Sequence, residues 1–141
     1  MIANAERRLR VLIVDNEEEK LELYFSVFVS KGYSVRKAIT CADALALVPI
    51  FRPDAVFTSL FDVSRSDPDL CLSLRKMPET VEALIVAITN YGIPINDNRA
   101  TAGFDYFLVR PISLSKVLET MQHLVGYKGD SVKAVRVPIY D

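Results

Sequence analysis

Polar side chains follow short apolar segments at several places in this chain, and their types suit chemistry at a single small site. The apolar segments are residues 11–14, 55–58, 84–88 and 107–109, and the polar side chains that follow or end them are Asp15, Ser59, Thr89 and Arg110. Short apolar runs of this kind are typical of strands buried on both faces of a parallel sheet. Because the carboxyl ends of such strands line the ligand crevice of an open α/β sheet, we expect these side chains to meet at one edge.

Ser59 stands at the end of its strand, where a reacting group would lie. A hydroxyl forms a phosphate ester, and a serine without an adjacent base is a poor nucleophile. The one histidine, His123, falls on the polar side of the last predicted helix and offers no base. We therefore expect Ser59 to be a hydrogen-bonded hydroxyl at a strand end.

The elements that position these residues alternate along the first 125 positions, strand then helix. This pattern predicts βαβ units and an α/β fold with a parallel sheet. The first helix opens with residues 17–19 and ends near Gly32, and Leu21, Phe25 and Phe28 are predicted to face the sheet.

Further strands and helices follow the same alternation. Residues 34–38 form a strand, and Thr40 caps a short helix that runs through Val48 and stops before Pro49. A third helix starts at residues 67–68 and closes before Pro78. A loop at residues 90–94 leads to a short helix that ends at residue 103. The last helix is capped by Ser113 and carries the apolar stripe Leu114, Val117, Leu118, Met121 and Leu124.

Composition limits the possible functions. The 141 residues suffice for one domain, and half of them are hydrophobic. A net charge of −1 argues against nucleic-acid binding. Cys41 and Cys71 match no disulfide framework or zinc pattern and are predicted to be buried thiols. With no run of about 20 apolar residues and no signal sequence, we expect no membrane association and a cytoplasmic location.

The last residues differ in character from the rest. We place one folded domain at residues 1–125 and a C-terminal tail at residues 126–141. Apolar and polar residues alternate from Val135 to Tyr140, which favours either an added edge strand, in this chain or a partner, or a mobile tail.

The order and spacing of the polar residues resemble the response-regulator receiver domain over residues 9–125, with one short deletion near the fourth helix. The resemblance implies a flavodoxin-like three-layer sandwich with a five-stranded parallel sheet in the order 2-1-3-4-5. In that family an acid pair, an acceptor aspartate, a hydroxyl and a lysine bind magnesium and the phosphoryl group. The matching positions here are Asp15, Asn16, Ser59, Thr89 and Arg110.

Departures from the family pattern change what the pocket can bind. Of the family's acids only Asp15 remains, because Asn16 and Ser59 carry no charge. Magnesium prefers carboxylate and water oxygens, so we expect no magnesium and no other cofactor. The backbone carbonyl of Phe61 is the other family-type ligand that survives, and Asn16 has an alternative role as the N-cap of the first helix.

The remaining family positions concern the phosphate contact and the switch. Arg110 has a planar fork that pairs with carboxylates, so we expect it to bind Asp15. The resemblance implies a cis peptide bond before Pro111. It also implies that Phe107 replaces the switch aromatic, and without a phenolic oxygen this ring is predicted to stay buried.

These observations favour a phosphorylation-independent protein-interaction module in phosphorelay-type signalling, a monomer or homodimer and not an enzyme. The predicted contact residues for a protein partner are Ile95, Asn98, Arg99, Tyr106, Leu108 and Lys116. One alternative is an active receiver, phosphorylated with magnesium at a displaced acceptor, either Asp62 or Ser59. Another is a flavodoxin-like binder of a nucleotide or small anion, although no glycine cluster follows the first strand.

Overall fold

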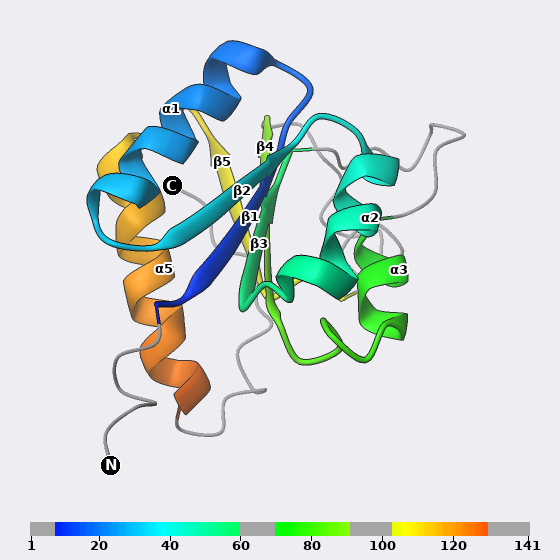
Figure 1. Cartoon of the computed structure of the whole chain (residues 1–141). Helices are drawn as coiled ribbons and strands as arrows, with labels where there is room; N and C mark the ends of the chain where they lie inside the picture. The colour runs from blue at the N-terminus through cyan, green and yellow to red at the C-terminus, as the bar shows by residue number, and fades with distance from the viewer. Residues whose placement is uncertain (1–7, 60–69, 91–102, 130–141) are drawn as a thin grey trace.

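The computed structural model describes residues 8–59, 70–90 and 103–129, which form a parallel sheet with helices on both faces (Figure 1). The strands are β1 (Arg10–Val14), β2 (Ser34–Ala38), β3 (Ala55–Thr58), β4 (Leu84–Asn90) and β5 (Tyr106–Arg110). The helices are α1 (Glu18–Ser30), α2 (Cys41–Phe51), α3 (Leu70–Lys76) and α5 (Leu114–Gly129). Every neighbouring pair of strands is parallel, in the order β2-β1-β3-β4-β5. The predicted fold class and strand order are confirmed.

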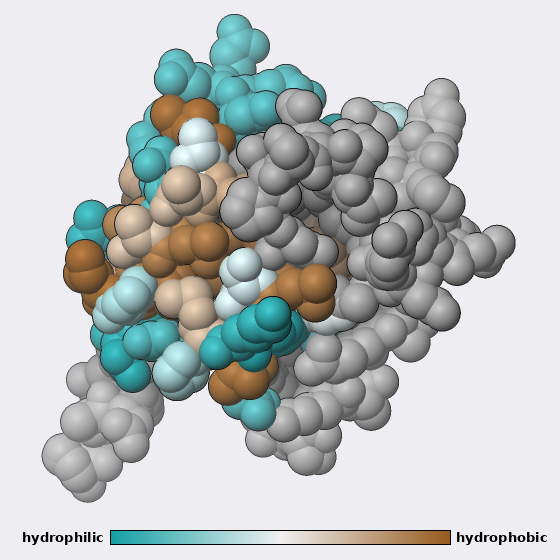
Figure 2. All heavy atoms as spheres, turned by 90° about the vertical axis from the view of Figure 1, so that its right-hand side faces the viewer, coloured by the Kyte–Doolittle hydropathy of each residue, from teal (hydrophilic) through white to brown (hydrophobic). Residues whose placement is uncertain are grey.

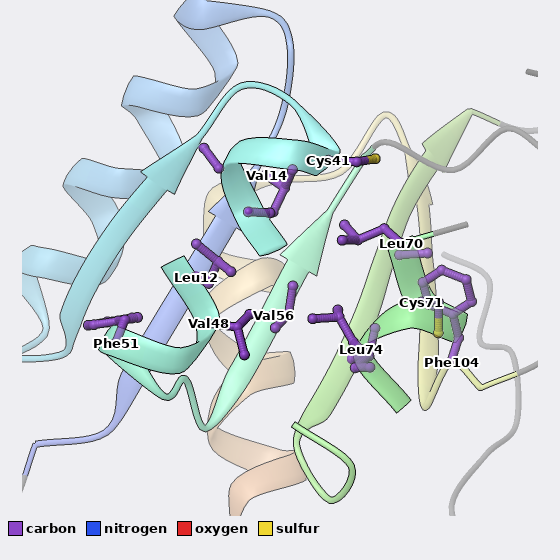
Figure 3. Close-up of a cluster of buried hydrophobic side chains, with 14 of the residues drawn as sticks. Leu12, Val14, Cys41, Val48, Phe51, Val56, Leu70, Cys71, Leu74 and Phe104 are labelled. Carbon is purple, nitrogen blue, oxygen red and sulfur yellow. The ribbon is translucent and has the colours of Figure 1, made fainter. Parts of the chain in front are cut away.

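Two apolar cores lie on opposite faces of the sheet. Alternate residues of a strand point to opposite faces, so Val11 and Ile13 join the core under α1 and α5, whereas Leu12 and Val14 join the core under α2 and α3. Figure 3 shows part of the second core, where Val48 of α2 and Leu74 of α3 pack against this face of the sheet. Burial on both faces explains why these strands are continuously apolar.

Helix α1 turns a different side to the sheet than the sequence predicts. Its buried residues are Leu21, Tyr24 and Phe28, so the prediction that Phe25 faces the sheet is wrong. Phe25 is half-buried, and the Nζ of Lys37 in the edge strand β2 lies 4.5 Å from the centroid of its ring. The Lys37 ammonium group therefore covers the Phe25 ring, which the helical spacing of apolar residues had assigned to the core.

Helix α2 begins as predicted but ends later. The Oγ1 of Thr40 accepts a hydrogen bond from the Asp43 N–H at 3.0 Å, which confirms the predicted cap. The prediction that the helix stops before Pro49 is wrong, because it continues to Phe51. Pro49 removes one helical hydrogen bond, but continuing the helix buries Phe51 to 8% exposure. The helix ends at Arg52, whose φ of 54° lies in the left-handed region.

Helix α5 begins as predicted. The Ser113 side chain caps α5 by accepting the Lys116 N–H at 3.1 Å, as predicted. The helix runs to Gly129, beyond residue 125, where we placed the end of the receiver-like domain. The predicted start of the third helix, the loop after residue 90 and most of the short helix before residue 103 lie outside the described residues, as do residues 130–141.

Both cysteines are buried thiols that form no disulfide bond, as predicted. None of the described helices is long and apolar enough to cross a membrane.

A largely buried arginine on α3, with a side chain that is 13% exposed, fixes the starts of β4 and β5. Arg75 Nη2 lies 2.9 Å from Asp105 Oδ2, Nε donates to the Gly103 carbonyl at 2.9 Å, and Nη1 donates to the Ala83 carbonyl at 2.7 Å. Asp105 Oδ2 also accepts the Ile85 N–H at 2.9 Å. One guanidinium therefore holds together segments that are far apart in sequence.

Candidate functional site

The strand ends that carry the predicted site residues lie side by side at one edge of the sheet. Asp15 directly follows β1 and Ser59 directly follows β3, and these strands are in register with Val14 opposite Thr58. In the next pair, Thr89 of β4 lies opposite Val109, one residue before Arg110. The sheet therefore brings the four predicted strand ends to the same edge, as in other open α/β sheets.

An ion pair between Asp15 and Arg110 crosses this edge. Arg110 Nη2 lies 3.3 Å from Asp15 Oδ2, and the side chains are 16% and 2% exposed. β3 and β4 lie between β1 and β5, so the pair joins strands that are not neighbours. The predicted ion pair is present, and it neutralises a carboxylate that is almost completely removed from water.

The second oxygen of Asp15 also has a partner. Asp15 Oδ1 accepts the backbone N–H of Glu17 at 2.8 Å. The N-cap position of α1 is held by Glu17, without a capping hydrogen bond from its own side chain to the described helix. Asn16 is exposed, so its predicted role as the N-cap is wrong. Aspartate commonly bonds the backbone two residues on, and this turn chemistry is the sequence signal that could have identified Asp15 instead.

Ser59 is anchored through its backbone. Its N–H donates to the Val14 carbonyl at 3.0 Å, which extends the pairing of β3 with β1, and the residue is half-buried. Its side chain brings a neutral hydroxyl to the strand end. Asp62 and Phe61, the candidate displaced acceptor and carbonyl ligand, lie outside the described residues.

Thr89 and Phe107 lie behind the edge, on the α2 and α3 side of the sheet. Thr89 is 7% exposed and Phe107 is 3% exposed. The Phe107 ring packs against that of Phe104, with ring centroids 5.0 Å apart. The ring therefore lies in the buried position that its apolar character predicts. The peptide bond between Arg110 and Pro111 is cis.

The described residues do not fit a magnesium site. Asp15 is the carboxylate at this edge, and both of its oxygens already accept hydrogen bonds, one of them from the cationic Arg110. Within residues 8–59, 70–90 and 103–129, no three His, Cys, Asp or Glu side chains come together as a metal site would require. A divalent cation would have to displace the guanidinium and would then find, among the described residues, a single charged ligand.

The predicted partner surface is partly wrong. Tyr106 and Leu108 are 6% and 1% exposed and belong to the core under α1 and α5, so they cannot line a contact surface. Alternate positions of this apolar strand face that core, as expected for a strand buried on both sides. Lys116 is half-buried on α5, and Ile95, Asn98 and Arg99 lie outside the described residues.

Comparison with known proteins adds to this picture. No family model matches the chain. It is 27% identical over 119 residues to the response regulator MprA of Mycobacterium sp. (strain KMS), which covers 83% of this chain and 50% of that protein. It is 22% identical over 117 residues to the polar-differentiation response regulator DivK of Brucella anthropi, covering 82% of this chain and 95% of that protein. The chain thus spans about half the length of the MprA proteins that it matches.

Solved structures share the fold. A receiver domain protein (CheY-like) from Methanospirillum hungatei superposes with a TM-score of 0.73 at 20% identity, over 89% of this chain and 99% of that one. The chemotaxis response regulator CheY4 of Vibrio cholerae gives a TM-score of 0.72 at 22% identity, over 84% and 99% of the two chains.

Fold and site define an open, doubly wound α/β domain with its polar residues at the carboxyl edge of the sheet. The strand order is that of the flavodoxin-like CheY fold. The chain is thus similar in sequence to response regulators of two-component signalling and shares its fold with CheY-like receiver domains. Receiver domains are generally signalling modules rather than enzymes, and response regulators interact with protein partners.

Proposed function

We propose that this receiver signals by protein contact, without phosphorylation and without magnesium. The observation that carries the proposal is the Asp15–Arg110 ion pair, at 3.3 Å, beside a strand end that carries Ser59. The pair uses the carboxylate that would otherwise attract a metal ion, and the guanidinium that would otherwise contact a phosphoryl group.

The chemistry of Ser59 supports the same conclusion. A carboxylate acceptor forms a labile acyl phosphate, whereas a serine forms an ester that needs an activated hydroxyl. The one carboxylate that the described strand ends bring near this edge, Asp15, is held by Arg110 and the Glu17 N–H and is poorly placed to act as a base. Among the described residues, the pocket therefore offers neither a carboxylate acceptor at the end of β3 nor a base that would activate Ser59.

A ligand shifts a conformational equilibrium only by its differential affinity for the two states. Among the described residues, one acidic side chain is balanced by one basic side chain, so this part of the edge offers little differential affinity for a phosphoryl group or a divalent ion. The buried Phe107 ring has no polar tip that could gain a hydrogen bond on moving. We infer a receiver that holds one conformation and presents it to a protein partner in the cytoplasm, with no catalytic activity of its own.

Acetyl phosphate labelling tests the proposal. The chain is incubated with acetyl phosphate and magnesium, and its intact mass is measured. We expect no added phosphoryl group. The matched control is the triple variant Asn16→Asp, Ser59→Asp, Arg110→Lys, which restores the family's residues at these positions and is expected to gain a hydroxylamine-sensitive phosphoryl group.

Labelling of the unmodified chain would contradict the proposal and favour an active receiver. Asp62→Ala and Ser59→Ala then locate the acceptor, because only the variant that lacks the modified residue loses the label. A magnesium titration followed by thermal unfolding gives an independent readout. Binding raises the melting temperature, so we expect a rise for the triple variant alone.

A further inference from the structure

The outward side of α2 is apolar, although the helix lies on the outside of the domain. Ten of its eleven residues, CADALALVPIF, are apolar, and Asp43 is its one charged residue. Its exposed apolar residues lie at spacings of four, three and one, which puts them on one stripe of the helix. This stripe, called here the α2 stripe, consists of Ala42, Ala46, Pro49 and Ile50.

The opposite side of α2 already covers the sheet. Cys41, Ala44, Val48 and Phe51 are buried in the core that α2 shares with α3. A helix that is apolar all round is typical of a helix covered on both sides, and contiguous exposed apolar surface marks interaction sites. Ile50 is 81% exposed, more than any other large apolar side chain among the described residues. Figure 2 shows apolar side chains gathered on the face of the molecule that α2 and α3 cover.

Opposite charges stand at the two ends of the α2 stripe. Asp43 lies in the first turn and Arg52 is the C-cap, nine positions later, so they are separated by about 13.5 Å along the helix. Both are exposed, and among the described residues neither side chain takes part in an ion pair. The stripe therefore has a positive end and a negative end.

We infer that the α2 stripe binds a second copy of this chain, with the two α2 helices antiparallel about a twofold axis. In that arrangement Asp43 of each copy lies at the level of Arg52 of the other, and the small Ala46 lies at the level of Pro49. A parallel arrangement would instead bring like charges to the same level. Twofold dimers with self-complementary interfaces are the commonest protein oligomers, and small residues let two helices approach closely.

This inference goes beyond the proposed function, because it does not depend on how the Asp15 pocket behaves. The α2 stripe lies on the outward side of a helix, whereas the pocket lies at the carboxyl edge of the sheet. A failure of one proposal therefore leaves the other unchanged.

Sedimentation velocity over a range of protein concentrations tests the association. We expect a monomer–dimer equilibrium in the unmodified chain. Ile50→Glu is expected to raise the dimer dissociation constant by roughly tenfold or more, because a buried apolar contact is replaced by a charge. The control is Leu23→Glu, at a side chain that is 53% exposed on α1, on the other face of the sheet, and we expect it to leave the dissociation constant unchanged.

Charge reversal tests the antiparallel arrangement itself. Asp43→Arg and Arg52→Asp are each expected to weaken the dimer, and the double variant is expected to restore it. Circular dichroism confirms that each variant is folded. A chain that stays monomeric at every concentration would overturn the inference, as would equal weakening by Leu23→Glu and Ile50→Glu. A double variant that is weaker than either single variant would overturn the antiparallel arrangement.

Discussion

Replacing Arg110 with methionine tests whether the ion pair organises the pocket. The Asp15 side chain is 2% exposed and would lose its cationic partner, keeping the Glu17 N–H as a hydrogen-bond donor. Breaking a buried ion pair by removing one partner costs about 3–5 kcal/mol, because a charge is left buried without compensation. Arg110 is 16% exposed, so water can reach its side of the pocket. We therefore expect a loss near the lower end, about 3 kcal/mol.

Equilibrium unfolding in urea, followed by circular dichroism, measures this loss. The matched variant is Asp15→Asn, which keeps an oxygen for the Glu17 N–H but removes the charge. We expect the double variant Asp15→Asn, Arg110→Met to be more stable than Arg110→Met alone, because no buried charge remains. A loss below about 1 kcal/mol for Arg110→Met, or a double variant as unstable as the sum of the two losses, would refute this reasoning.

Three further predictions concern residues near the starts of the strands, at the edge of the sheet opposite the pocket. Arg75→Met removes a guanidinium that is 13% exposed, and we expect urea unfolding to give a loss of about 3–5 kcal/mol. Gly103→Ala would put a Cβ 2.9 Å from Cys71 Sγ at a φ of +88°, so it should cost about 1–3 kcal/mol by the same assay. Its control is Gly32→Ala at a φ of +92°, where no described atom lies within 4 Å, so a comparable loss there would exclude the contact as the cause. Burial raises the pKa of Tyr33 above its ordinary value of 10.0, so the folded state retains a proton that the unfolded state releases. We expect stability measured against pH to fall as pH rises above 10, and Tyr33→Phe to remove that part of the fall.

The strands could be predicted because burial on both faces leaves a direct signal in the sequence. The run before Asp15 is continuously apolar, since Val11 and Leu12 enter different cores. The buried side of each helix was harder to predict, because only one side of a helix packs against the sheet. Tyr24 and Phe25 are neighbours, and the helical spacing selected Phe25 although Tyr24 is the residue that faces the core.

The end of α2 shows how tertiary contacts override local preference. Pro49 is an unfavourable residue within a helix, yet the buried Val48 and Phe51 on either side of it keep the helix in place. A reading of local signals ends the helix at the proline, because the stabilising contacts come from the distant strands of the sheet.

The site residues also differ in whether the sequence alone could predict their contacts. The Asp15–Arg110 pair could be predicted because both residues end strands that meet at one edge. The assignment of Leu108 to a partner surface was wrong, because this residue of β5 is buried in the core under α1 and α5. The role of Arg75 had no local signal, because its acceptors, such as Asp105, lie far along the chain and meet it only in the folded structure.

Mass spectrometry of the protein purified from its own cells tests the central claim most directly. The chain is isolated under conditions that preserve acyl phosphates, and its intact mass is compared before and after treatment with hydroxylamine. The account predicts that both samples give a single mass, that of the unmodified chain, even when the protein is isolated together with its partner. A phosphoryl adduct that hydroxylamine removes would contradict it.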